Sequence, residues 1–235
     1  GSHCHHQRFE RGKVATDLKV TGECSDTGTT ITFKPDAEIF ETVEFDRNVL
    51  LLRLREQAFL NAGLRIVLRD TRCADGGEPF EADLCYEGGI SSFVDYLHKK
   101  RGLEPLHPDI IHLTAQEGDS IAEVAMQYND SYNELILSFA NNINTVEGGT
   151  HEAGFKSGLT KVMNDFARRY NLLKENDKNL TGEDVREGLT AVISVKLTDA
   201  QFEGQTKAKL GNTAMRSMVD SLISDKLAQY FEENP

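Results

Sequence analysis

TAVISVKL, residues 190–197, places apolar side chains on both faces of a predicted β-strand. Half of its residues are β-branched, and β-branched residues favour strands. A strand that is apolar on both faces is covered on both sides by other elements, so we expect it in the middle of a sheet. The polar stretch LTDAQFEGQTKAKLGN, residues 197–212, follows this strand and precedes a long amphipathic stretch at 215–231.

Further strands are predicted where apolar and polar residues alternate between turn residues. They cover residues 5–14, 28–34, 64–70, 78–86, 109–115, 121–128 and 133–140. The pair at 64–70 and 78–86 is expected to form a hairpin with its turn at Asp75-Gly76-Gly77.

Helices are predicted where apolar residues recur on one helical face. They cover residues 42–62, 90–102, 150–166 and 215–231. Gly63 is the expected C-terminal cap of the first helix, and Thr150 the expected N-cap of the third. Thr181 and Asp184 have a spacing close to that of a capping box.

Gly88 and Gly89 divide the chain into two predicted mixed α/β units, residues 1–86 and 87–235. The 235 residues are 39% hydrophobic and 27% charged, with a net charge of −12 and a pI of about 5.1. This acidic balance disfavours a protein whose whole surface binds nucleic acid, although it leaves room for a local basic patch. No apolar run approaches the ~20 residues that span a membrane.

The cysteines Cys4, Cys24, Cys73 and Cys85 lie far apart, which favours reduced thiols in a cytosolic protein. The histidines near the start have no matching ligand partners, so we expect no native metal site. The opening letters GSH are interpreted either as a cloning scar or as native residues.

The polar stretch after the central strand carries the strongest candidate site. Lys207 and Gln205 lie between Gly204 and Gly211, and glycines permit close approach of a ligand. A lysine ammonium is a compact, mobile charge that suits a phosphate oxygen, and a glutamine amide can donate to a second oxygen. A solvated surface lysine is the alternative interpretation.

Four ordered motifs support the site interpretation. They are YEGGI at 86–90, NNINTVEGGTHEAGF at 141–155, GEDVREGLTAVISVK at 182–196 and QFEGQTKAKLGN at 201–212. Together they resemble the B subunit family of bacterial DNA gyrase, over essentially the whole chain. The B-type subunit of topoisomerase IV has very similar motifs.

The resemblance implies a fold for each unit. Residues 1–86 are expected to be the C-terminal part of the ATP-binding sandwich that gyrase shares with mismatch-repair and heat-shock chaperone ATPases. Residues 87–235 are expected to be a transducer domain of ribosomal-protein-like fold, a mixed sheet backed by helices. Because strands of the first domain's sheet are missing from these residues, we also expect that domain to expose apolar surface.

The resemblance also implies site residues. Lys207 corresponds to the family's lysine that contacts the γ-phosphate of ATP, with Gln205 beside it. Gly28 and Thr29 match the residues that line the adenine pocket, where Thr29 hydrogen-bonds adenine through a water. Turn formation and helix capping are the favoured interpretation of Gly148 to His151, and a structural role is expected for His151.

ATP and Mg²⁺ are the cofactors that the resemblance implies for the parent enzyme. The family's general base, its Mg²⁺-binding asparagine and its glycine-rich phosphate cradle have no counterpart among these 235 residues. We therefore expect this polypeptide to bind neither cofactor and to hydrolyse no ATP by itself. The implied partners are the gyrase A subunit and DNA in a heterotetramer, and a second B subunit through the ATPase domain. No membrane is expected, and the implied location is the bacterial cytoplasm, at the nucleoid.

The implied function is to couple ATP binding and hydrolysis to DNA strand passage and negative supercoiling. A decatenating topoisomerase IV subunit is the close alternative. A stand-alone nucleic-acid-binding module is a second alternative, which the acidic charge disfavours. A chaperone or mismatch-repair middle domain is the third, and EGGTH and QTKAKLGN fit gyrase better.

Overall fold

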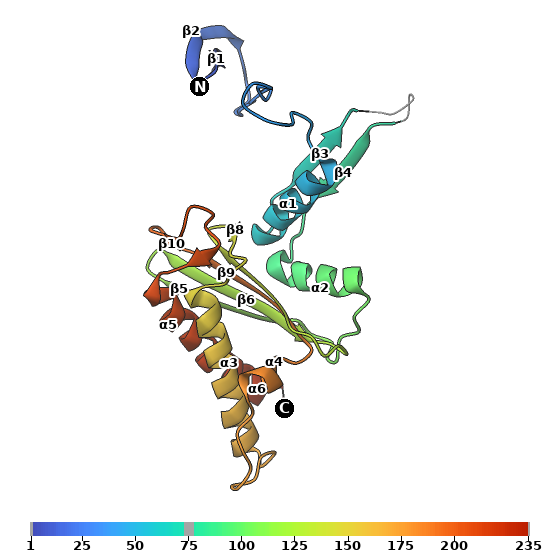
Figure 1. The fold of residues 1–235 in the computed structure, drawn as a ribbon, viewed down its shortest axis with the longest axis vertical. Coiled ribbons are helices and arrows are strands. Elements are labelled where there is room, and N and C mark those ends of the chain that lie inside the picture. The colour runs from blue at the N-terminus through green and yellow to red at the C-terminus, as the bar shows by residue number, and fades with distance from the viewer. Residues whose placement is uncertain (1, 73–77, 235) are drawn as a thin grey trace. The chain divides into compact units, whose positions relative to one another are not determined.

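The computed structural model describes residues 2–72 and 78–234, and the chain divides into two compact units at Leu50 and Leu51 (Figure 1). Cys73 and the predicted turn at Asp75-Gly76-Gly77 lie outside the described residues. The predicted boundary near residues 86–89 remains a prediction. Among the residues that the structure describes, every helix is too short or too polar to cross a membrane.

The first unit contains one antiparallel pair, β1 (His3–Glu10) and β2 (Lys13–Glu23). Arg11 and Gly12 form the turn with left-handed φ angles of 48° and 77°. The predicted strand at 5–14 is therefore wrong in its bounds, because it runs across this turn.

Residues 28–34 form no regular secondary structure and join no sheet, so the second predicted strand is wrong. Ile31 and Phe33 are 81% and 72% exposed, since no neighbouring strand covers their alternating apolar face. The expected apolar exposure of this part of the chain is confirmed by a group of large side chains: Phe9, Val14, Leu18, Val20, Ile31, Phe33, Ile39 and Phe40.

Helix α1 (Arg47–Leu60) begins five residues later than predicted. Asp46 explains the start, because its carboxylate accepts hydrogen bonds from the backbone N–H groups of Asn48 (2.7 Å) and Val49 (3.2 Å). Gly63 has a left-handed φ of 78°, but it donates to the carbonyl of Tyr86 and not to a helix carbonyl. Its predicted capping role is therefore wrong.

The predicted hairpin and the short helix after it are confirmed. Strands β3 (Ile66–Asp70) and β4 (Phe80–Leu84) pair antiparallel. Helix α2 (Gly89–Arg101) ends at Gly102, whose left-handed φ of 64° lets its N–H reach the last-turn carbonyls.

A five-stranded sheet carries the rest of the second unit, in the order β5-β6-β9-β7-β8. Strand β9 (Leu189–Lys196) is central, antiparallel to β6 and parallel to β7, as TAVISVKL predicts. Seven of its eight residues are buried, and each buried valine or isoleucine contributes about 1.5–3 kcal/mol relative to exposure. The remaining strands are β5 (Ile111–Glu117), β6 (Ser120–Tyr128), β7 (Leu135–Ala140) and β8 (Ile143–Asn144).

One face of the sheet packs on the longest helices of the unit (Figure 1). Helix α3 (Thr150–Arg169) lies beside α5 (Thr213–Leu222), which continues through a π-helical turn at Ile223–Leu227 into α6 (Ala228–Glu233). Short helix α4 (Gly182–Arg186) opens with the predicted capping box at Thr181.

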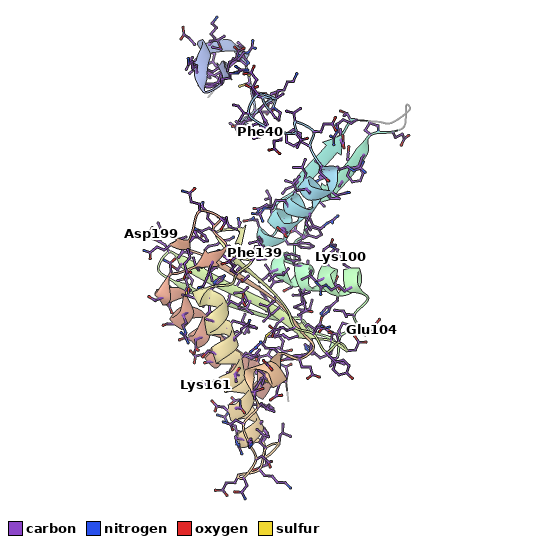
Figure 2. All side chains as sticks on the ribbon, viewed as in Figure 1. Phe40, Lys100, Glu104, Phe139, Lys161 and Asp199 are labelled. Carbon is purple, nitrogen blue, oxygen red and sulfur yellow. The ribbon has the colours of Figure 1, made fainter. Side chains whose placement is uncertain are left out.

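The opposite face of the sheet packs on α2 and on the end of α1. Phe93 of α2 stacks on Phe59 of α1 at a ring-centroid distance of 4.6 Å and lies 6.1 Å from Phe139 of β7 (Figure 2). This aromatic cluster joins the last turn of α1 to the sheet, so α1 and the sheet form one core.

Candidate functional site: the Lys207 hairpin

The stretch that carries Lys207 is a short hairpin and not an irregular loop. Strand β10 (Phe202–Glu203) pairs antiparallel with β11 (Lys209–Leu210). Between them the chain turns with left-handed φ angles at Gly204 (76°) and Lys207 (55°). We call residues 197–212 the Lys207 hairpin.

The root of the hairpin is closed by the side chain of Asn212. Its Oδ1 accepts from the backbone N–H of Gln201 (2.7 Å), and its Nδ2 donates to the carbonyl of Asp199 (2.9 Å; Figure 2 labels Asp199). The N–H of Gly211 donates to the carbonyl of Gln201 at 2.7 Å. These bonds cross the root from both sides and fix the two arms in register.

The inner arm of the hairpin is attached to the turn that begins α3. The Leu210 N–H donates to the carbonyl of Gly148 (3.2 Å), and the Glu147 N–H donates to the carbonyl of Ala208 (2.9 Å). Gly149 allows this approach, because a Cβ there would lie 2.5 Å from the Leu210 carbonyl oxygen. Leu210 itself is fully buried, so the hairpin has a rigid inner arm.

Thr150 takes part in the same attachment, and this corrects the sequence prediction for it. The N-cap of α3 is Gly149, and Thr150 is the first helical residue. Its hydroxyl donates to the carbonyl of Asn212 at 2.6 Å instead of accepting from its own helix.

The tip of the hairpin presents Lys207 and Gln205 to solvent. Within residues 2–72 and 78–234, the Lys207 ammonium has no carboxylate within 4.0 Å; it lies 5.9 Å from the ring of Phe202. Lys209 instead pairs with Glu203 at 3.1 Å. Among the described residues the charge of Lys207 is thus unpaired, whereas that of Lys209 is partnered by Glu203.

Gly28 and Thr29, the predicted adenine-side residues, are both exposed in the first unit. They line an open hollow together with residues of β1 and of 30–45. Gly28 and Thr29 thus lie in the first unit, whereas Gln205 and Lys207 lie in the second. Their predicted contacts with a nucleotide remain predictions.

A buried polar network beneath the hairpin was not recognised from the sequence. The Thr145 hydroxyl lies 3.1 Å from His151 Nε2 and 2.8 Å from the hydroxyl of Ser138, which donates to Glu152 at 2.9 Å. His151 is fully buried, in keeping with the structural role predicted for it, and burial lowers its pKa to about 4. The other members of this network come from β7, from the residue after β8 and from α3, so no spacing in the sequence identifies them.

We expect this buried histidine to make stability depend on pH. The unfolded chain binds the His151 proton below its ordinary pKa of 6.5, whereas the folded chain stays neutral down to about pH 4. The free energy of unfolding should therefore fall as the pH drops from 6.5 to 4, by about 3 kcal/mol in total. Urea unfolding followed by circular dichroism should show a smaller loss in this window for His151→Gln; an identical pH dependence would contradict the assignment.

A search of the described part of the chain finds no group of three or more His, Cys, Asp or Glu placed to hold a metal ion. His3, His5 and His6 all lie on the exposed strand β1.

Comparison with known proteins gives a consistent result. The family model described as DNA gyrase B matches residues 89–235. The B subunit of DNA gyrase from Clostridium acetobutylicum is 54% identical over 233 residues, which are 99% of this chain and 36% of that protein. The corresponding protein of Halalkalibacterium halodurans is 54% identical over 98% of this chain and 36% of its own length. The chain therefore spans about a third of the length of these relatives.

Solved structures agree with the fold. The 43K ATPase domain of Thermus thermophilus gyrase B, solved in complex with an aminocoumarin, is 38% identical with a TM-score of 0.84. The topoisomerase IV ATP binding domain of Francisella tularensis, in complex with a small-molecule inhibitor, is 26% identical with a TM-score of 0.79. Each alignment covers 100% of this chain and 62% of the other.

Proposed function

This chain belongs to the DNA gyrase B family, and we propose that it is the region that couples ATP binding and hydrolysis to DNA strand passage and negative supercoiling. Residues 1–86 then contribute part of the ATP-binding domain, and residues 87–235 form the transducer. The partners in the parent enzyme are the gyrase A subunit, DNA and a second B subunit. ATP with Mg²⁺ is the nucleotide that the parent enzyme uses.

Lys207 is the residue that senses the nucleotide in this proposal. The single observation that supports it is an ammonium that has no carboxylate partner among the described residues and stands at the tip of a hairpin whose root and inner arm are fixed. Such a charge 4 Å from a phosphate oxygen is worth about 4 kcal/mol before desolvation, at an effective dielectric constant of 20. Gln205, two residues earlier, donates its amide to a neighbouring oxygen or orients a water.

The geometry explains how a local contact reaches the rest of the unit. Phosphoryl transfer is catalysed mainly by positioning and by charge stabilisation, which Lys207 supplies at the terminal phosphate. When that phosphate leaves, the ammonium loses its partner. The hairpin root is closed by Asn212, and its inner arm is bonded to the start of α3. A displacement of the tip therefore moves both arms together and reaches the start of α3.

Topoisomerase IV is the second candidate, since its ATP binding domain from Francisella tularensis also aligns with the whole chain. The higher identity and TM-score of the gyrase structure, 38% and 0.84 against 26% and 0.79, favour gyrase.

A nucleotide-affinity measurement tests the role of Lys207. In the full-length protein, Lys207→Ala should lower the affinity for a non-hydrolysable ATP analogue by about 10- to 100-fold relative to the affinity for ADP. The reason is that ADP lacks the phosphate that the ammonium contacts. Lys209→Ala is the matched control, since that lysine is already paired with Glu203. Titration calorimetry gives both affinities, and an unchanged ratio for Lys207→Ala would refute the sensor role.

A further inference from the structure

The turn between β7 and β8 consists of two consecutive left-handed asparagines. Asn141 has a φ of 48° and Asn142 a φ of 63°. Asparagine tolerates this region better than most residues, but two in succession still carry a conformational cost. That cost is offset by two sets of hydrogen bonds, one from Asn141 to the root of the Lys207 hairpin and one between Asn142 and helix α1.

Asn141 bonds to the root of the Lys207 hairpin. Its Nδ2 donates to the carbonyl of Leu197 (2.8 Å), and its Oδ1 accepts from the N–H of the same residue (2.9 Å). The Asn141 N–H also donates to the carbonyl of Val195 at 2.9 Å. Both backbone groups of Leu197 are thus held at the point where the chain leaves β9 and enters the hairpin.

Asn142 bonds to helix α1. Its carbonyl accepts from Gln57 Nε2 (3.0 Å) and from the guanidinium of Arg53 (3.3 Å), one helical turn apart. Its Nδ2 lies 3.3 Å from the Oδ1 of Asn61, just past the helix end.

Lys196, the last residue of β9, adds a second contact to the same helix end. Its ammonium lies 3.4 Å from the carbonyl oxygen of Leu60 and 3.4 Å from Asn61 Oδ1. A cation at the last carbonyls of a helix interacts favourably with the helix dipole.

We propose that the Asn141–Asn142 turn is a positioning element that fixes helix α1 to the root of the Lys207 hairpin. The two asparagines are adjacent, and each is held by hydrogen bonds to its own neighbour, so a displacement at Asn142 is transmitted to Asn141. Asn141 passes it to Leu197, and the Asn212 closure passes it from the root to the arms. This inference rests on the proposed role of Lys207 and adds the residues that set the position of its ammonium.

A turn that only stabilises the fold would have the same bonds, so the test needs a readout at Lys207 itself. Trypsin cleaves after lysine, and Lys207 is exposed in a turn. In the full-length protein with the gyrase A subunit and DNA, a non-hydrolysable ATP analogue should slow cleavage after Lys207 by about tenfold, within the usual range of coupling between sites. Fragment masses separate this cut from that after Lys209.

Asn141→Gly is the informative variant. Glycine adopts a φ of 48° without strain, so the turn is kept while both side-chain bonds to Leu197 are lost. Asn171→Gly is the matched control: Asn171 is exposed with a φ of 56°, and its side chain makes no hydrogen bond to any residue that the structure describes. We call the factor by which the ATP analogue slows cleavage after Lys207 the protection. This protection should fall to about twofold or less in Asn141→Gly and stay near the wild-type value in Asn171→Gly.

Gln57→Met tests the other end of the connection: it keeps helix propensity and removes the shortest of the hydrogen bonds between Asn142 and the end of α1. If the two ends act through one turn, the double variant should lose no more protection than the stronger single variant. Gln57→Met also keeps the test decisive if Asn141→Gly fails to fold.

The outcomes separate the two proposals. Absence of protection in the wild type would overturn the role of Lys207, and the positioning role with it. Protection in the wild type that is retained in Asn141→Gly, or in Gln57→Met, would overturn the positioning role alone. Additive losses in the double variant would also overturn it, because they would show two independent effects.

Discussion

Replacing Lys207 by alanine in the full-length protein should lower ATP-driven supercoiling by about 100-fold or more, the usual cost of removing one donor to developing charge in an active site. The side chain carries a charge that is unpaired among the described residues and stands at the tip of a hairpin with a fixed root. Lys209, the other lysine of the hairpin, instead pairs with Glu203. A gel assay of relaxed plasmid, with the gyrase A subunit present, gives the rate.

Lys209→Ala provides the control for this experiment. It removes a lysine of the same hairpin, and with it only an exposed ion pair worth about 0–1 kcal/mol. Supercoiling should stay within about threefold of wild type, which corresponds to less than 1 kcal/mol. Equal activity of Lys207→Ala and Lys209→Ala would remove the basis for a sensing role, and circular dichroism of both variants would exclude misfolding as the cause of any loss.

The second large effect is expected on stability, at the contact between α3 and α5. Gly154 faces the backbone of α5 so closely that a Cβ would lie 2.3 Å from the Arg216 carbonyl oxygen. Gly154→Ala forces the helices apart, and we expect a loss of at least about 3 kcal/mol, the upper end for overpacked sites. Thermal unfolding should show a midpoint lower by roughly 6–12 °C.

Gly182→Ala is the matched control on a neighbouring helix. A Cβ there would approach the guanidinium of Arg186, the far end of a flexible side chain, at 2.6 Å. Because replacing glycine by alanine also lowers the conformational entropy of the unfolded chain, worth about 0.4–1 kcal/mol, we expect the midpoint to be unchanged or slightly higher. A Gly154→Ala protein as stable as Gly182→Ala would mean that α3 and α5 can separate at little cost.

Elements whose signals are local were predictable from the sequence. The position of β9 at the centre of the sheet follows from its apolar residues on both faces. The capping box at Thr181 is encoded within four residues, and Gly102 ends α2 by its own backbone freedom. The capping box and the helix end depend on contacts between near neighbours, and the apolar pattern that makes β9 central lies within the strand itself, so the sequence records all three directly.

Predictions failed where the partner lies far away in the chain or where the described residues supply none. Residues 28–34 alternate as a strand does, but without a neighbouring strand their backbone groups have no ladder to join. Thr150 has the side chain of an N-cap, yet its hydroxyl donates to Asn212, 62 residues away. A propensity describes the conformations and hydrogen bonds that a residue favours, and a partner far away in the sequence decides which of them forms.

The candidate site divides in the same way. The sequence alone, through the ordered motifs and the polar stretch after β9, determined the family resemblance, the candidate pair Gln205 and Lys207, and the alternation of strands and helices. Only the tertiary structure decided that Lys207 has no carboxylate partner among the described residues while Lys209 is held by Glu203, and that Asn141 and Asn142 join the hairpin root to α1. The physical reason is that a hydrogen bond or ion pair depends on distances of about 3 Å between groups, and chain folding sets these distances for residues that are far apart in the sequence.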